Sequence, residues 1–175
     1  MKVIGLAGWS GAGKTTLLTR VIPHLRERGL RVSVIKHAHH NFDIDKPGKD
    51  SWRHREAGAE EVLVSSGNRW ALMHELRGAQ EPRLPELLKK MSRVDLVVVE
   101  GYKNDPHRKI EVYRAGNGKP FLFPGDAGIV GIVSDIAVET VLPTAHLDDI
   151  PEVADMLLTS AVSLDDVPSM ATAES

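Results

Sequence analysis

One stretch near the start of the chain, Gly8-Trp9-Ser10-Gly11-Ala12-Gly13-Lys14-Thr15-Thr16, fits the pattern G-x-x-x-x-G-K-[ST]. Its glycines lack a Cβ, so the backbone can turn tightly and direct several N–H groups toward one point. Those amides and the positive end of a following helix form an anion site. Lys14 adds a positive charge for the β- and γ-phosphates of a nucleotide, and the Thr15 hydroxyl is a ligand for Mg²⁺. The stretch therefore predicts a phosphate-binding loop.

A second stretch, Asp95 to Gly101, supplies acidic side chains for the same chemistry. Its continuous run of Leu and Val is typical of a central strand that is buried on both faces, and an acid at its end resembles the Walker B element that supports Mg²⁺. Ligands of open α/β sheets lie beyond the carboxyl ends of the strands. Glu100 is at that end, whereas Asp95 is about 16 Å away at roughly 3.3 Å per residue. We expect Glu100 to support the metal.

The elements that must position these groups alternate between strands and helices. An apolar run over 2–7 predicts a strand, helical spacing of leucines predicts a helix over 15–28 that Gly29 ends, and residues 31–36 predict a second strand. This βαβ unit indicates a parallel sheet. Later residues predict helices over 82–91 and 151–158 and strands over 95–101, 128–133 and 145–147. The fold class is therefore α/β, with a mostly parallel central sheet between two layers of helices.

Two pairs of segments depart from the βα alternation. Residues 61–65 and 69–76 flank a turn and predict a hairpin, which we expect to be an antiparallel extension at the edge of the sheet. Trp70, Leu72 and Leu76 share one of its faces, which either packs on its own core or forms a dimer surface. Residues 109–113 and 120–123 form either a second hairpin or two separate strands.

If the core strands are parallel, four segments meet at one edge of the sheet: the phosphate-binding loop and residues 37–50, 100–103 and 134–135. Residues 37–50 form a long polar loop, and such loops are often functional. Ser51 is expected to cap a short helix over 52–57. Three histidines and two aspartates of this loop suggest a metal site, but their spacing is irregular, so we expect a solvated loop over the phosphate site.

Composition limits the class of protein. The chain has 175 residues, of which 42% are hydrophobic and 26% charged, as in an ordinary globular protein. We expect one nucleotide-binding domain over residues 1–160 and a disordered tail over 161–175, which is polar and rich in small residues. A net charge of −2 gives no general attraction to nucleic acid or to membranes. The 0 cysteines exclude disulfides and thiol catalysis and fit a cytoplasmic protein.

Three further stretches make the chain resemble a known family. They are Lys36 to His40, Asp43-Ile44-Asp45-Lys46-Pro47-Gly48-Lys49-Asp50-Ser51, and Val99-Glu100-Gly101-Tyr102-Lys103. With the phosphate-binding loop, they resemble the MobB family, the GTP-binding adapters of molybdopterin-guanine dinucleotide biosynthesis. The resemblance extends over about residues 2–158.

The resemblance implies a P-loop NTPase fold and a homodimer that binds GTP with Mg²⁺ and hydrolyses it weakly. It also implies a mainly adapter role, assisting the guanylyltransferase MobA, and contact with molybdopterin-loaded proteins. Lys14 and Glu100 would act in hydrolysis, Thr15 and Glu100 would hold the metal, and Asp45, Lys49 and Lys103 would line the same cleft. The phosphates would be held by Ser10, Gly11, Ala12, Gly13, Lys14, Thr15 and Thr16.

The sequence departs from other GTPases in how it would recognise guanine. They usually use an Asn/Thr-Lys-x-Asp motif, which this chain lacks. We expect Asp135, at a strand end, to accept hydrogen bonds from the N1 and N2 groups of guanine. Guanine specificity therefore rests mainly on the resemblance.

The alternative function is a small-molecule kinase on the same fold. A kinase needs a base, for which Asp43 or Asp45 is available, and usually an Arg-bearing lid, for which Arg53 or Arg55 is available. No compact Arg-rich lid is evident. The same arginines and Arg108 are the candidates for stabilising charge during hydrolysis, and each is more simply interpreted as a solvated charge. We therefore expect slow hydrolysis.

Overall fold

The computed structural model describes residues 1–38, 42–102 and 105–167 and divides the chain into two compact units. The first unit consists of Met1–His37 and Arg83–Ser175, and the second of Ala38–Pro82. The region expected to be one domain thus contains both units. Among the described residues, no helix combines the length and apolar character needed to cross a membrane.

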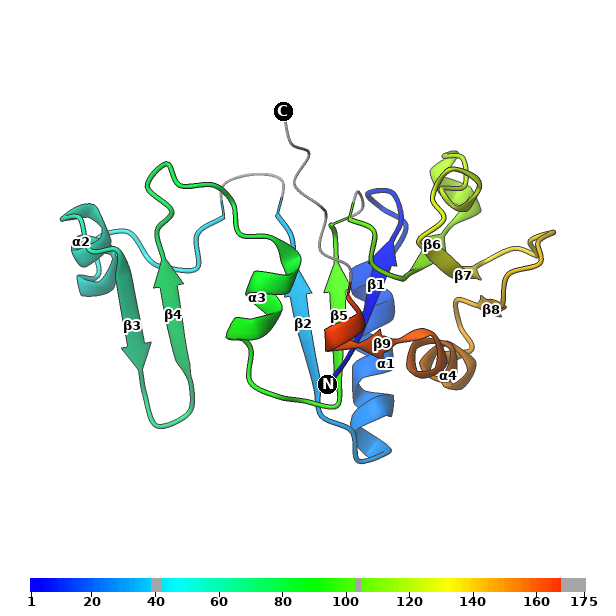
Figure 1. The fold of residues 1–175 in the computed structure, drawn as a ribbon, viewed down its shortest axis with the longest axis horizontal. Coiled ribbons are helices and arrows are strands. Elements are labelled where there is room, and N and C mark those ends of the chain that lie inside the picture. Colours follow the sequence, from blue (N-terminus) through cyan, green and yellow to red (C-terminus); the bar gives the residue numbers. More distant parts are fainter. Residues whose placement is uncertain (39–41, 103–104, 168–175) are drawn as a thin grey trace. The chain divides into compact units, whose positions relative to one another are not determined.

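The first unit is built on a sheet whose main strands are all parallel (Figure 1). Their order is β2-β5-β1-β6-β7-β8, which places β1 (Lys2–Ala7) between β5 (Leu96–Glu100) and β6 (Lys109–Tyr113). The remaining strands are β2 (Val32–Lys36), β7 (Ile129–Ser134) and β8 (Thr144–His146). Every residue of β5 is buried, as its apolar run predicts. The parallel pairing brings the carboxyl ends of these strands to one edge, as expected.

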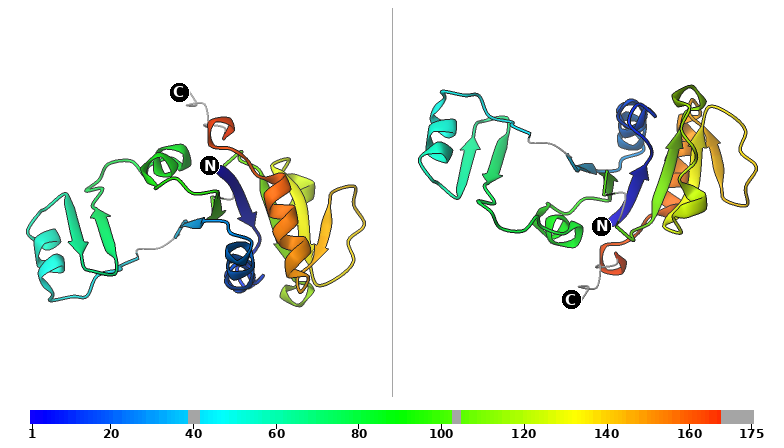
Figure 2. Two further views of the ribbon diagram at one scale, coloured as in Figure 1. Left: turned by 90° about the horizontal axis from the view of Figure 1, so that it is seen from below. Right: turned by 90° about the horizontal axis from the view of Figure 1, so that it is seen from above.

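Helices cover both faces of this sheet (Figure 2). On one face, α1 (Lys14–Glu27) and α4 (Ile150–Ser160) pack on β1 and its neighbours, and the leucines and valine of α1 that the helical spacing identified are buried. On the other face, α3 (Leu84–Lys90) buries Leu84 and Leu88 against Val97 and Val99. Fully burying each such side chain stabilises the folded protein by about 1.5–3 kcal/mol. The two helix layers therefore hold in place the strands whose carboxyl ends lie near the phosphate loop.

The end of the described chain differs from the disordered tail that we expected from residue 161. Val162–Ser163 form β9, which pairs antiparallel with Lys2 and Val3 of β1. A short 3₁₀ helix, η3 (Leu164–Asp166), follows, and Val167 is buried in the α3 cluster. Residues 161–167 therefore pack on the first unit, because β1 offers them backbone partners and α3 offers an apolar surface. Residues 168–175 lie outside the described residues.

The second unit contains the predicted hairpin, β3 (Glu61–Ser65) and β4 (Trp70–His74), and the helix α2 (Asp50–Glu56). The hairpin is antiparallel, but it forms a two-stranded sheet of its own, so its expected place at the edge of the main sheet was wrong. The expected cap of α2 was also wrong. Lys49 occupies the N-cap position, and the Ser51 hydroxyl instead donates to the Asp45 carboxylate.

The segment after β6 also differs from the two interpretations of residues 109–123. Residues 109–113 form a parallel strand between β1 and β7, while residues 120–123 form no strand and lead into a 3₁₀ helix, η2 (Phe123–Gly125). The reason is the buried Glu111, whose carboxylate accepts hydrogen bonds from the backbone N–H groups of Leu122 and Phe123 at 2.8 and 2.9 Å. These bonds fold the segment back over β6. Burial raises the pKa of Glu111.

Candidate nucleotide-binding site

The phosphate-binding loop connects β1 to α1, the order of elements that the motif requires. Gly8 lies so close to β6 that a Cβ there would overlap the carbonyl oxygen of Val112. Gly13 is the N-cap of α1 and has φ 92°, a conformation that favours glycine. The Lys14 ammonium group crosses the loop and donates to the carbonyl oxygens of Gly8 and Trp9, at 2.7 and 3.1 Å. The loop therefore has the curvature and charge of an anion site.

Thr15 and Glu100 meet at the carboxyl ends of β1 and β5. The Thr15 hydroxyl donates to Oε1 of Glu100 at 3.0 Å, and Lys36 Nζ lies 3.6 Å from the same oxygen. Asp95, at the opposite end of β5, accepts a 2.7 Å hydrogen bond from the Arg31 backbone, which lowers the pKa of its carboxyl. The structure thus places Glu100, and not Asp95, beside the loop. Lys36 is a contact that sequence reasoning missed.

The chemistry of Thr15 and Glu100 fits Mg²⁺. This ion prefers oxygen ligands, and it is usually held by one or two protein groups together with phosphate oxygens and water. One hydroxyl and one largely buried carboxylate provide such a set. Elsewhere among the described residues, no cluster of three or more His, Asp or Glu side chains is arranged for a metal. His39 and His40 lie outside the described residues, so a histidine metal site stays untested.

A turn after β6 forms a wall of the site that the sequence did not reveal. It contains a 3₁₀ helix, η1 (Ala115–Asn117), preceded by Arg114. The Asn117 side chain donates to the Ser10 carbonyl oxygen at 3.0 Å, and the Trp9 indole donates to the Pro120 carbonyl oxygen at 2.8 Å. The two glycines that flank Asn117 are typical of a turn, but their spacing does not indicate which loop this turn contacts. These contacts make residues 114–120 a neighbour of the phosphate loop.

Asp135 follows β7 and faces this turn. Its Oδ1 accepts a 2.8 Å hydrogen bond from the Ala115 backbone, and its Oδ2 lies 4.0 Å from Nη1 of Arg114. Asp135 therefore lies at the expected edge of the sheet and also holds the turn. Its proposed contact with guanine remains a prediction.

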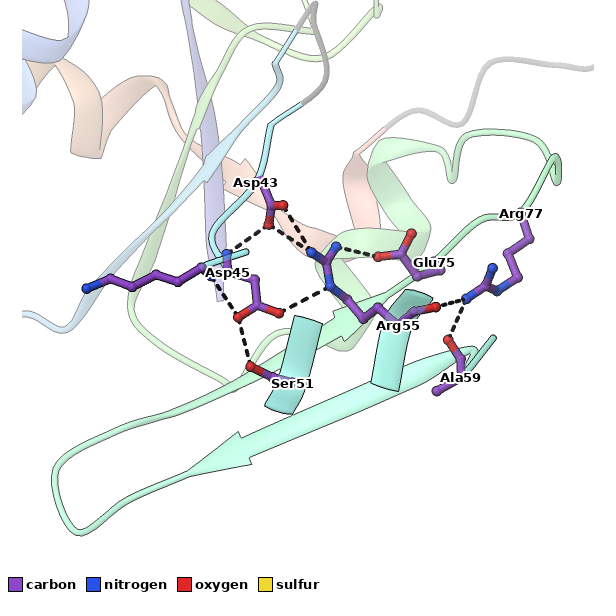
Figure 3. A network of polar contacts seen from close by, with 8 residues as sticks. Asp43, Asp45, Ser51, Arg55, Ala59, Glu75 and Arg77 are labelled. Atoms are coloured by element: carbon purple, nitrogen blue, oxygen red, sulfur yellow. Dashed lines mark hydrogen bonds and ion pairs between the residues drawn. The ribbon is translucent and has the colours of Figure 1, made fainter. Parts of the chain in front are cut away.

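The other predicted residues lie in the second unit or outside the described residues. Asp45 and Lys49 belong to the second unit, and Lys103 is not among the described residues. Figure 3 shows that Asp45 is part of a polar network around Arg55. Arg55 Nε lies 3.3 Å from Asp45, while its other nitrogens contact Asp43 and Glu75 at 3.0 and 2.8 Å. Whether Asp45 and Lys49 line the nucleotide site stays a prediction.

The Arg55 network bears on the kinase alternative. The Arg55 side chain is only 14% exposed and contacts three carboxylates, so its interpretation as a solvated charge was wrong. Hydrogen bonding from the Asp45 backbone, together with Arg55, lowers the pKa of Asp43. Asp45 accepts hydrogen bonds from Ser51 and from the Lys46 backbone besides Arg55. Both aspartates are thus engaged in folding the loop, and neither is arranged as a general base.

Comparison with known proteins identifies close relatives. A family model described as molybdopterin guanine dinucleotide synthesis protein B, or MobB, matches residues 3–135. The molybdopterin-guanine dinucleotide biosynthesis adapter protein of Escherichia coli (strain K12) is 40% identical over 159 residues, covering 89% of this chain and 91% of that protein. The Haemophilus influenzae adapter protein is 41% identical over 157 residues, covering 89% and 86%.

Solved structures agree with these relatives. A crystal structure of molybdopterin-guanine biosynthesis protein B has a TM-score of 0.69 and 27% identity, and the match covers 90% of this chain and 98% of that chain. The crystal structure of Bacillus subtilis MobB has a TM-score of 0.73 at 23% identity, covering 93% and 99%, and it bears on the fold alone. The predicted P-loop NTPase fold, with a mostly parallel sheet and an antiparallel hairpin, is confirmed.

Proposed function

The chain belongs to the MobB family, and on this premise we propose that it is a GTP-binding adapter protein with weak Mg²⁺-dependent GTPase activity. In this role it assists the guanylyltransferase, MobA, which joins GMP to molybdopterin in the synthesis of molybdopterin-guanine dinucleotide. In the same role, this protein would also contact molybdopterin-loaded proteins. Its relatives in Escherichia coli and Haemophilus influenzae are adapter proteins of this biosynthesis, which supports the same role here.

The observation that carries the GTP-binding proposal is the contact between Thr15 and Glu100 beside the phosphate loop. Residues 10–16 would hold the phosphates through backbone amides and the Lys14 ammonium group. Thr15 and Glu100 would hold Mg²⁺, which would neutralise charge on the phosphate oxygens. Asp135, at the carboxyl end of β7, is the proposed acceptor for the N1 and N2 groups of guanine.

Weak hydrolysis is proposed because little in the site orients an attacking water. Glu100 is already bonded to Thr15 and lies near Lys36. Rapid GTPases add a residue that positions the attacking water, and a partner often completes the catalytic site. The proposed adapter would thus retain GTP until the guanylyltransferase is present.

A homodimer is proposed from the hairpin of the second unit. Leu63 and Trp70 are 59% and 65% exposed, and Leu72 lies opposite Leu63 in the register of β3 and β4. These three side chains form an apolar face that a second copy would cover. Replacing Trp70 by Glu should convert dimers to monomers in sedimentation experiments, whereas replacing the exposed Arg69 by Glu should not. A wild-type chain that sediments as a monomer at all concentrations would exclude the dimer.

We also propose a cytoplasmic location and no binding to nucleic acid or membranes. The sequence holds 0 cysteines, which fits a reducing compartment, and its net charge of −2 gives no general attraction to polyanions.

The adapter role is tested by measuring formation of molybdopterin-guanine dinucleotide by the guanylyltransferase at limiting GTP. Adding this protein should stimulate product formation, and the stimulation should decline as GTP saturates the enzyme. The Lys14→Ala variant is the matched control, since it should not stimulate. No stimulation at any GTP concentration, together with rapid hydrolysis by this protein alone, would indicate an independent enzyme instead.

A further inference from the structure

We propose that Arg114 contacts the phosphates of the bound nucleotide and that Asn117 positions it. This inference rests on the proposed GTP site, and it adds to that site a residue that neither the motif nor the family resemblance identified. The two side chains belong to the turn after β6, where Arg114 precedes η1 and Asn117 is the last residue of η1.

Two hydrogen bonds hold the turn that carries Arg114, one to the phosphate loop and one to Asp135. On one side, Asn117 donates its 3.0 Å hydrogen bond to Ser10 of the phosphate loop, and a Cβ on Gly11 would lie 3.0 Å from Oδ1 of Asn117. On the other side, Asp135 accepts the Ala115 N–H at 2.8 Å. Two hydrogen bonds to two different strand ends leave the turn little freedom to move away from the loop.

The guanidinium group of Arg114 lies over Gly13, the residue from which α1 begins. A Cβ built on Gly13 would lie 3.4 Å from Nη2 and 3.7 Å from Nε of Arg114. The amides of residues 13–16 at this helix end are those expected to cradle phosphate. Arg114 therefore brings a positive charge to within contact distance of the loop's anion site.

Arg114 retains donors for a ligand. Its side chain is 45% exposed, and its ion pair with Asp135 is long, at 4.0 Å. A guanidinium group has five N–H donors in a planar fork that matches two oxygens of a phosphate. Asp135 lies beside the guanidinium group without covering it, so the carboxylate orients the side chain while the donors over Gly13 face the loop.

These contacts predict that Arg114→Ala weakens nucleotide binding, by an amount that depends on how many phosphates the nucleotide carries. Charge-assisted hydrogen bonds of this kind correspond to an increase in Kd of about tenfold to a hundredfold. The loss should be large for GTP and GDP and small for GMP, because the loop and its lysine hold mainly the β- and γ-phosphates. Arg114→Lys should recover part of the affinity, since lysine keeps the charge but not the fork. Arg93→Ala, which changes an exposed arginine that precedes β5, is the matched control.

The experiment is titration calorimetry of each variant with GTP, GDP and GMP in the presence of Mg²⁺, with unfolding temperature measured without nucleotide to establish folding. A wild-type protein that binds no GTP would overturn the proposed function itself. Wild-type binding with Arg114→Ala unchanged within about twofold, or an equal loss in Arg93→Ala, would overturn this inference alone.

Asn117 is tested by a double-mutant cycle. If Asn117 acts through Arg114, then Asn117→Ala should weaken GTP binding in the wild-type background and have little further effect in the Arg114→Ala background. Strictly additive losses would show that Asn117 does not position Arg114.

Discussion

The Thr15 hydroxyl donates a 3.0 Å hydrogen bond to the Glu100 carboxylate, although 85 residues separate the two in the sequence. The parallel pairing of β1 with β5 produces this contact, because Leu6 lies opposite Glu100 and Thr15 belongs to the first turn of the helix that follows β1. Position in the sheet therefore decides which acid serves the phosphate loop.

Glu100→Gln should reduce Mg²⁺-dependent GTP hydrolysis by about tenfold or more while changing nucleotide affinity much less, because the amides that hold phosphate remain. The glutamine still accepts the Thr15 hydroxyl but no longer neutralises the metal. Single-turnover hydrolysis and GTP affinity are the two measurements. Asp95→Asn is the control and should leave both unchanged, since Asp95 bonds to Arg31 at the other end of β5. A larger effect of Asp95→Asn would contradict the assignment.

Lys14→Ala should abolish nucleotide binding and leave the fold intact, since the ammonium group contacts loop carbonyls and is not part of the apolar core. A ligand at a hundred times its Kd stabilises the native state by about 2.7 kcal/mol. Wild type should therefore show a rise in unfolding temperature with GTP and Mg²⁺, and the variant none. Lys90→Ala, at the end of α3, should behave as wild type. If GTP and Mg²⁺ raise the unfolding temperature of Lys14→Ala as much as that of wild type, then Lys14 does not contribute to nucleotide binding.

Asp135→Ala should narrow the preference for GTP over ATP, because a site that hydrogen-bonds a specific group rejects analogues that lack it. The measurement is the ratio of the GTP and ATP dissociation constants in wild type and variant. Asp155→Ala, which changes an exposed acid of α4 that pairs with Arg28, is the control. Equal weakening of GTP and ATP would show that Asp135 acts only by holding the turn at Ala115.

His107 should make stability depend on pH. Burial and the nearby Lys109 lower the pKa of His107 to about 4, and a Cβ on Gly5 would overlap its ring. The unfolded chain, with a pKa near 6.5, binds the proton more readily. The free energy of unfolding therefore has its full value above about pH 6.5. It decreases as the pH falls toward 4, by about 3 kcal/mol in total.

The check is urea unfolding across this pH range. His107→Gln should flatten the decline, whereas the exposed His54→Gln should keep it. An identical decline in wild type and His107→Gln would assign the pH dependence to other groups.

Arg55→Met should loosen the second unit, because three carboxylates lose the cation that holds them together. Limited proteolysis should cut within residues 42–82 faster than in wild type. Arg53→Met changes an exposed residue of the same helix and should not alter the rate. Equal cleavage rates in wild type and Arg55→Met would show that the network does not stabilise this unit.

The sequence predicted the elements whose pattern is strong. The buried runs of β1, β5 and β7 and the leucine spacing of α1 are local signals, and all four elements are present. It did not predict β9, whose two residues pair with the start of β1, where β6 does not reach, and whose Val162 packs against the α3 cluster. The contacts of Arg114 and Arg55 were not predicted for a similar reason. Their partners are separated in sequence, and an isolated arginine in a polar stretch resembles any solvated charge.

The central place of β1 has a consequence for how the protein is made. β1 pairs with residues 96–100, 109–111 and 162–163, all of which are synthesised after it, most of them much later. Such distant pairing delays folding, because the intervening chain must be available before the contacts form. A nascent chain that ends before β6 therefore contains the Gly-Lys-Thr residues but lacks the strand and turn that shape them into a loop. If the proposed nucleotide site needs the turn that contains Asn117, then GTP would bind only chains synthesised beyond this residue and would not guide the folding of the first βα unit.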